Sequence, residues 1–277
     1  MAKNFSFSVS GQKTTVVLDT GSIFNESYVE PAQSPIDCFS DEVGRIVTML
    51  GSPSLPLTAE WRVMANLSVL GVVSSVETYF RRMIRRTLMI DSISQECSYD
   101  KNLPYGAAIH HDQSLLPEAL MEGMNFSTEK SIRDGLKSLL GVSVGQNEKV
   151  LAALKQYDVV CNLRHCIVHR SGRLGAKNAI RFGLNDHGRF LEKPIEVDFD
   201  SVHEIFAICR SLVQEVNDFV FCELLKRSGG AIRWKKDLRK DKPHLKKYFD
   251  IFCVEEKNNN SELKECHKLL MKVAYVP

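Results

Sequence analysis

The chain has 277 residues, of which 44% are hydrophobic and 25% are charged, and its formal net charge is +2. This composition is that of a folded globular protein and excludes a disordered or fibrous chain. Because the charge is nearly balanced, it does not by itself indicate a nucleic-acid partner, and any such function must depend on local clusters of charge.

Nothing near the N-terminus has the apolar core of a signal peptide. The most apolar stretch, residues 63–76, is interrupted by Asn66, Ser68 and Ser74 and is too short to span a bilayer. The eight cysteines are scattered without a Cys-x-x-Cys pair, which favours a reducing compartment over a disulfide framework. We therefore expect a cytoplasmic protein that does not enter a membrane.

Residues 1–35 differ from the rest of the chain. Phe5, Phe7 and Val9 alternate with serines, and residues 14–18 are rich in β-branched side chains. Alternation with turn residues nearby is typical of strands. This segment is predicted to form a short β-hairpin or an extended arm.

Residues 36–227 have helical periodicity and predict a bundle of four or more helices, so the fold class is mainly all-α. A first helix is expected from Ser40 to Leu50, and Thr58 opens a second that runs to about Ile90. One buried stripe is predicted on the second helix, made by Val63, Leu67, Leu70, Val73, Val76, Phe80, Met83 and Ile84.

The second half of the bundle begins after an irregular stretch, residues 97–117, which is predicted to be a loop. Ser127 is expected to cap a helix that Gly141 ends, and the next helix spans about 148–170. Residues 181–182 and 195–199 are predicted to form a small hairpin. A long helix then starts at Asp200 or Ser201 and continues to about Leu224.

The C-terminal extension, residues 228–277, is basic at its start. Residues 226–247 contain ten Lys or Arg and two Asp, and residues 258–260 predict a turn before a final short helix. Lys235, Lys236 and Arg239 are candidates for binding RNA phosphates. The same cluster could instead bind an acidic partner, or it could be an ordinary solvated surface.

The most chemically capable segment is residues 161–173, which reads Cys-Asn-Leu-Arg-His-Cys-Ile-Val-His-Arg-Ser-Gly-Arg. At about 100° per residue, Asn162, His165, Cys166 and His169 are predicted to share one helical face. Arg164 falls among apolar residues, where an arginine is unusual unless it has a use.

An imidazole beside a guanidinium suits cleavage of RNA by its own 2′-hydroxyl. Histidine exchanges a proton near neutral pH, and the planar fork of arginine binds a phosphate bidentately. No metal is required, because the nucleophile belongs to the substrate, and we expect neither a metal nor a cofactor.

These residues resemble the signature of the HEPN superfamily, which is an arginine, a polar residue, three mostly apolar residues and a histidine. Arg164, His165, residues 166–168 and His169 match it in order, although the family more often has Asn at the second position. The resemblance extends in outline over residues 58–227. It implies a helical bundle that forms a homodimer with both motifs in one cleft and acts as a ribonuclease.

By this resemblance Arg164, His165 and His169 are the expected catalytic residues. Two residues could support them: Asn162 could orient a histidine from one turn away, and Glu77 could pair with Arg164 or a neighbouring arginine. Arg170 and Arg173, which follow the motif, are further candidates for contact with RNA. Members of the family often serve as toxins or in defence against phage, so an antitoxin or a sensor protein is an expected partner.

Two alternatives remain open. The chain could be a non-catalytic helical module that binds a partner protein or a nucleotide, with Arg164 as the anchor for an acidic group. A zinc site is the second alternative, because Cys161, His165 and His169 recur at four-residue steps, with Cys166 alongside. A second group of zinc ligands could come only from the histidine pair His110 and His111.

Overall fold

The computed structural model describes residues 7–11, 14–51, 58–232 and 234–273. The chain divides into two compact units, residues 1–32 and 33–277. The described residues form α-helices and short 3-10 helices but no strand, so the predicted all-α class is confirmed. The α-helices are α1 (Pro35–Leu50), α2 (Ala59–Leu88), α3 (Ser92–Ser98), α4 (Tyr105–His110), α5 (Leu116–Leu120), α6 (Glu129–Leu140), α7 (Glu148–His169), α8 (Ala176–Phe182), α9 (Leu184–His187), α10 (Phe199–Ile232), α11 (Leu238–Phe252) and α12 (Asn260–Val273).

The first unit is an extended arm, and its described residues do not form the predicted hairpin. Among its described residues the only regular element is a 3-10 turn at Thr20–Ile23, which Asp19 caps by accepting from the Gly21 N–H at 3.1 Å. Val9 and Val17 are 89% and 88% exposed. Alternating apolar residues form a strand only where another strand pairs with them, and the described arm supplies none. Phe5 lies outside the described residues.

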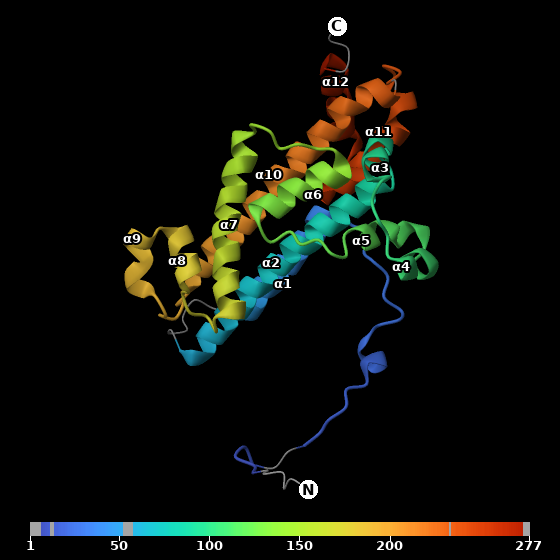
Figure 1. The fold of residues 1–277 in the computed structure, drawn as a ribbon. Helices are drawn as coiled ribbons and strands as arrows, with labels where there is room; N and C mark the ends of the chain where they lie inside the picture. The colour runs from blue at the N-terminus through green and yellow to red at the C-terminus, as the bar shows by residue number, and fades with distance from the viewer. Residues whose placement is uncertain (1–6, 12–13, 52–57, 233, 274–277) are drawn as a thin grey trace. The chain divides into compact units, whose positions relative to one another are not determined.

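Four long helices form the centre of the second unit. Helix α2 packs against α1, α7 and α10, and α7 packs along α10 (Figure 1). The apolar side chains that these helices bury belong to one continuous core. The predicted bundle is therefore present, and it begins at α1, where Ser34 accepts a hydrogen bond from the Asp37 N–H at 3.2 Å.

Helix α2 begins as predicted, and its predicted buried stripe is correct in the later turns but wrong in the first turns. Thr58 caps the helix by accepting from the Trp61 N–H at 3.1 Å. Val63 and Leu67 are 59% and 61% exposed, although they were predicted to be buried. Trp61, Ala65 and Val69 take their place, because α1 and the start of α10 cover that side of the first turns. The indole N–H of Trp61 donates to the Val197 carbonyl at 2.8 Å.

The predicted loop at 97–117 contains short helices, α3 to α5, in and around it. Arginines at the end of α2 hold the end of this stretch. Arg81 donates to the carbonyls of Met121 and Met124 at 2.9 and 2.7 Å, and Arg85 lies 3.2 Å from the Glu118 carboxylate. These contacts satisfy backbone groups that no regular element pairs.

Two further predictions for this unit need correction. Residues 181–182 do not belong to a hairpin, because they end α8, and the described residues contain only an isolated bridge between Arg173 and Pro194. The boundary expected at residue 227 falls inside α10, and α11 and α12 pack against the bundle in the same compact unit. The predicted final helix is present as α12, but the turn before it is a 3-10 turn at Glu255–Lys257, and Asn260 already belongs to the helix.

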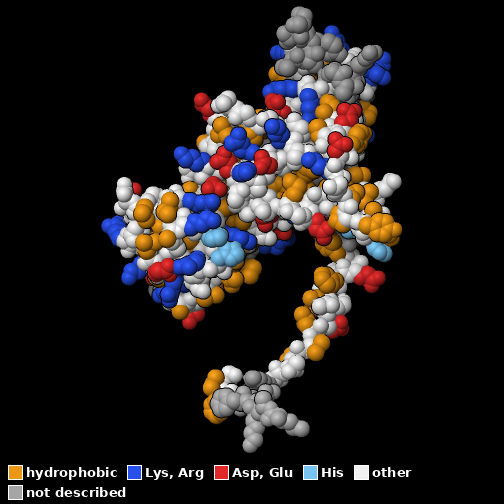
Figure 2. All heavy atoms as spheres, viewed as in Figure 1, with side chains coloured by type: hydrophobic (Ala, Val, Ile, Leu, Met, Phe, Trp, Pro, Cys, Tyr) orange, Lys and Arg blue, Asp and Glu red, His pale blue; other side chains and the backbone are white. Residues whose placement is uncertain are grey.

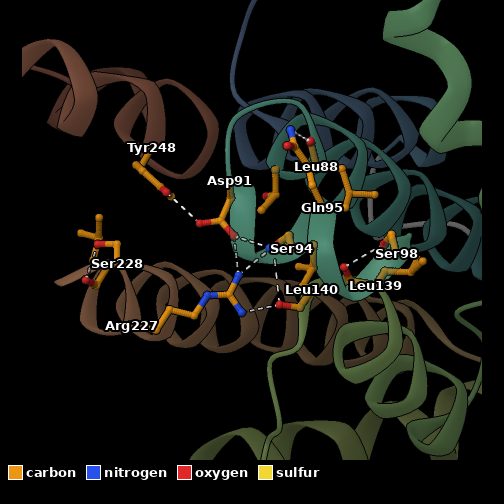
Figure 3. Close-up of polar contacts among 12 residues, drawn as sticks. Leu88, Asp91, Ser94, Gln95, Ser98, Leu139, Leu140, Arg227, Ser228 and Tyr248 are labelled. Carbon is orange, nitrogen blue, oxygen red and sulfur yellow. Dashed lines mark hydrogen bonds and ion pairs between the residues drawn. The ribbon is translucent and has the colours of Figure 1, made fainter. Parts of the chain in front are cut away.

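A buried carboxylate, that of Asp91, joins several helices (Figure 3). Asp91 is 2% exposed and caps α3 by accepting from the Ser94 N–H at 2.8 Å. It also accepts from the Tyr248 hydroxyl of α11 at 2.8 Å and from the Arg227 guanidinium of α10. Arg227 donates in addition to the Leu140 carbonyl at the end of α6.

Replacing Asp91 with Ala is expected to lower the free energy of unfolding by about 3 kcal/mol, because Arg227 loses its anion in a partly buried site. The measurement is urea unfolding of the wild type and the variant. The exposed Asp100 gives the matched control, since Asp100→Ala should change stability by less than about 0.5 kcal/mol. A loss below about 1 kcal/mol for Asp91→Ala would show that the network is dispensable.

The same comparison has an expected pH dependence. Burial raises the pKa of Asp91, but the hydrogen bonds from Ser94 and Tyr248 and the charge of Arg227 together hold it below the ordinary value. The stability that Asp91 contributes is therefore complete above the ordinary aspartate pKa and is lost as pH falls through the lowered value. The difference in free energy of unfolding between the wild type and Asp91→Ala should therefore become smaller in acid.

Candidate functional site

The Arg-x₄-His motif lies in the last turns of α7, as predicted. The helix is capped by Asn147, which accepts from the Val150 N–H at 3.1 Å, and it ends at His169. Ser171 and Gly172 follow with φ of 53° and 75°, and the Gly172 N–H donates to the Cys166 carbonyl at 3.1 Å. This left-handed turn sends the chain back towards α8.

The motif side chains divide between the surface and the interior. His165 and His169 are exposed, and their ring centroids lie 4.6 Å apart. Arg164 is half-buried and has no ion-pair partner among the described residues. Cys166, on the other side of the helix, is fully buried. The two imidazoles are therefore close enough to act on one bound group.

A cavity of about 210 Å³ opens beside Arg164 and His165. Its walls come from α7, from α8 and from the turn before α6. The lining residues are Ser127, Thr128, Asp158, Cys161, Asn162, Arg164, His165, Lys177, Asn178 and Arg181. Figure 2 shows histidine side chains on this face with Lys and Arg side chains around them, over the region of α7 and α8. Arg164, Lys177 and Arg181 outnumber the one carboxylate, Asp158, so the cavity is basic.

Asn162 builds the cavity instead of orienting a histidine. It is 5% exposed, and its amide nitrogen donates to the Asp158 carbonyl at 2.6 Å and to the Asp158 carboxylate at 3.1 Å. Its amide oxygen accepts from Asn178 at 3.2 Å and from the Arg181 guanidinium at 2.9 Å. Asn162 thus fixes α8 against α7 and positions a cation over the cavity.

The surroundings of His165 favour its neutral form. Burial lowers the pKa of His165, and the positive charges of His169, Lys177, Arg164 and Arg181 lower it further. A neutral imidazole accepts a proton from a substrate, so this environment suits a general base.

The thiol of Cys161, in contrast, is chemically inert. Burial raises its pKa to about 12, which keeps it protonated at neutral pH.

The other predicted site residues lie elsewhere. Glu77 accepts a hydrogen bond from the Phe126 N–H at 3.1 Å and does not pair with Arg164. Arg170 forms an ion pair with Glu192, and Arg173 forms the isolated bridge with Pro194.

Lys235, Lys236 and Arg239 lie far from the motif. Ile195, shortly before α10, donates to the Gly172 carbonyl at 2.7 Å, so the motif is near the start of that helix. The three basic residues follow its end. At 1.5 Å per residue, the 34 residues of α10 span about 50 Å. One short substrate segment cannot contact both places.

Lys177, Asn178 and Arg181 were missed because residues 181–182 were assigned to a strand. Arg181 follows Asn178 by three residues and Lys177 by four, and these helical spacings are the signal that could have identified them. Asp158 and Asn162 are likewise one turn apart on α7.

No zinc site is present in the described part of the chain, because no three His, Cys, Asp or Glu side chains there converge on a point that could hold a metal ion. Cys161 and Cys166 are buried, whereas His165 and His169 face outwards. His110 and His111 belong to α4 and its C-cap.

One helix among those described, α2, is long and apolar enough to cross a membrane by length and composition. Half of its most apolar window is buried in the structure. A core helix meets the same criterion, so this is weak evidence for a membrane span.

Comparisons with protein-family models, with curated proteins and with solved structures found no match.

Replacing Asn162 with Ala is expected to lower the free energy of unfolding by about 1–3 kcal/mol, because the Asn178 and Arg181 donors lose their acceptor. Amide hydrogen exchange should become faster in α8 while the core of α10 stays protected. The exposed Asn185 gives a control, since Asn185→Ala should leave both measurements nearly unchanged. Unaltered exchange in α8 for Asn162→Ala would contradict the role assigned to this residue.

Proposed function

We propose that the chain is a metal-independent endoribonuclease of HEPN type. The observation that carries this proposal is a pair of exposed imidazoles whose ring centroids lie 4.6 Å apart, one of which, His165, lines a basic cavity together with Arg164. The motif resemblance and the helical bundle agree with it. A role as a toxin or an anti-phage effector, held by an antitoxin or released by a sensor protein, is part of the same proposal.

The arrangement suits transesterification at an RNA phosphodiester. One imidazole accepts the proton of the ribose 2′-hydroxyl while that oxygen bonds to phosphorus, and the bond to the 5′-oxygen breaks. The other imidazole, protonated, gives its proton to the departing 5′-oxygen. The products are a 2′,3′-cyclic phosphate and a 5′-hydroxyl. His165, with its lowered pKa, suits the accepting role, and Arg164 suits the charge on the phosphate oxygens.

A second copy of the chain is proposed to complete the cleft. Apolar side chains are exposed close to the motif, with Val168 at 45%, Val159 at 41% and Ile180 at 64%. A shallow apolar groove of about 270 Å³, lined by Val159, Leu163, Phe182 and Phe190 among others, adjoins them. Exposed apolar side chains beside an apolar groove supply the kind of surface that a second copy could cover.

The alternative function is a non-catalytic module that holds a nucleotide or an acidic partner. It is favoured by the burial of Asn162, whose hydrogen bonds are all made within the protein. A basic cavity binds an anion whether or not the imidazoles exchange protons. The two functions share their ligand chemistry and differ in whether RNA is cut.

Replacing His169 with Ala is expected to reduce RNA cleavage by at least about 100-fold, because one of the two proton-transfer groups is lost. Wild type and variant are incubated with mixed tRNA and mRNA in EDTA, and fragment ends are mapped for cyclic phosphate. His110→Ala removes another exposed histidine and should cleave like the wild type.

Cleavage by His169→Ala at the wild-type rate would exclude the assigned chemistry. Absence of cleavage by the dimeric wild type, with RNA bound, would favour the non-catalytic module.

The acid side of the pH–rate profile tests the role of His165. Lys177 is one of the charges that lower the pKa of His165, so Lys177→Gln should raise that pKa. A general base with a higher pKa is protonated, and so inactive, at a higher pH. The fall in rate on the acid side of the profile, its acid limb, should therefore move to higher pH. Lys155→Gln, on an exposed turn of α7, should leave the limb in place. A limb that stays fixed in Lys177→Gln would mean that His165 is not the base.

A further inference from the structure

The cavity beside His165 continues into a second one. The second cavity has a volume of about 690 Å³ and shares three lining residues, Thr128, Asp158 and Arg181, with the first. Because these residues line both, the two cavities form one groove that runs from α7 and α8 across α6. Its outer part is lined in addition by Glu129, Lys130, Arg133, Asp134, Lys137, Ser143 and Val144.

Three cations of α6 lie along the outer part of the groove. Lys130, Arg133 and Lys137 are spaced by three and four residues, so they share one face of the helix, and all three are exposed. Arg133 pairs with Glu129 at 3.0 Å. Lys130 and Lys137 have no ion-pair partner among the residues that the structure describes, so their charges are available to an anion.

The groove as a whole is polar and positively charged. Six cations line it, namely Arg164, Lys177, Arg181, Lys130, Arg133 and Lys137, against the carboxylates of Asp158, Glu129 and Asp134. Two of these carboxylates are engaged, Glu129 by Arg133 and Asp158 by the Asn162 amide. Figure 2 shows Lys and Arg side chains, with Asp and Glu among them, over α6 and α7 on the face that carries the histidines.

The composition of the lining limits what the groove can recognise. It contains no Phe, Tyr or Trp side chain on which a base could stack, and Val144 is the only large apolar residue in its outer part. Proteins that grip single strands by their bases use aromatic platforms. A row of cations without aromatics instead contacts phosphates, and such contacts tolerate any sequence.

We propose that this groove holds the phosphate backbone of single-stranded RNA on one side of the bond to be cut, with Lys130 and Lys137 as phosphate-binding residues. The proposal rests on the proposed function and specifies its substrate. The groove is a recess bordered by α6, α7 and α8, whereas a duplex is bound across a broad surface that spans successive grooves. The groove reaches the motif directly, whereas the basic cluster after α10 is separated from the motif by about 50 Å along that helix.

The test compares two double variants that each remove two positive charges. Lys130→Gln with Lys137→Gln alters the outer groove, and Lys235→Gln with Arg239→Gln alters the cluster after α10. Both are made in the His169→Ala background, so that RNA stays intact during the measurement. Fluorescence anisotropy follows binding of a labelled, randomised RNA of about 12 nucleotides and of a hairpin duplex, over about 50 to 200 mM KCl.

The groove variant is expected to bind the single strand at least about tenfold more weakly, with the slope of log affinity against log salt smaller by about 1.4. The variant after α10 should bind within about twofold of its parent. An unfolding temperature near that of the parent shows that each variant is still folded. The proposal would be overturned if the groove variant bound the single strand as tightly as its parent, or if the variant after α10 lost more affinity than the groove variant. It would also be overturned if the parent bound the duplex more tightly than the single strand.

Cleavage by the otherwise wild-type protein separates this proposal from the proposed function. If the protein cuts RNA and the groove variant binds and cuts equally well, the nuclease stands and the groove assignment fails. If binding depends on Lys130 and Lys137 but no RNA is cut, the groove assignment stands and the nuclease fails.

Discussion

The Asp91 carboxylate is buried where the end of α2, the start of α3 and the helices α10 and α11 meet (Figure 3). A charge in such a place is costly unless donors surround it, and here two side-chain donors and one backbone N–H do so. This network fixes the position of α10 along its own axis. Because Arg227 also donates to the carbonyl at the end of α6, α10 cannot slide along the bundle without breaking several charged hydrogen bonds at once.

The fixed position of α10 determines the geometry of the candidate site at its other end. There the Trp61 indole holds the Val197 carbonyl, and Ile195 bonds to Gly172 just after the motif. The end of α7 is therefore tied to the start of α10, and Asn162 ties α8 to α7 in turn. The cations of the cavity come from two helices whose relative placement is set by these neutral hydrogen bonds. A site built in this way keeps its charges in position without a ligand.

The sequence predicted the parts of this structure that depend on local signals. Thr58 caps α2, the motif helix ends at His169, and a final helix follows near residue 260, because capping and periodicity are properties of neighbouring residues. The exposure of Val63 and the helical state of residues 181–182 were missed. Both depend on which element covers a face, and that is decided by tertiary packing.

The site was predicted in its motif and missed in its surroundings for the same reason. Arg164, His165 and His169 were identified because catalytic types of side chain are adjacent in the chain. Lys177 and Arg181 reach the cavity only through the fold of α8, and Glu77, which was expected to support the motif, is taken by the backbone of Phe126. Residue types can nominate a site from sequence, whereas the charges around it come from segments that a single sequence does not connect.

The electrostatics of the cavity link anion binding to proton exchange. The cations that would attract a phosphate, Lys177, Arg164 and Arg181, are also those that lower the pKa of His165. A bound phosphate places negative charge among them, offsets part of their field and raises the proton affinity of the imidazole. The lowered pKa favours the neutral form of His165 in the empty cavity, and a bound anion would favour its protonated form. A base that gains proton affinity when its substrate binds suits the proposed nuclease, whereas a module that only binds an acidic group does not use this change.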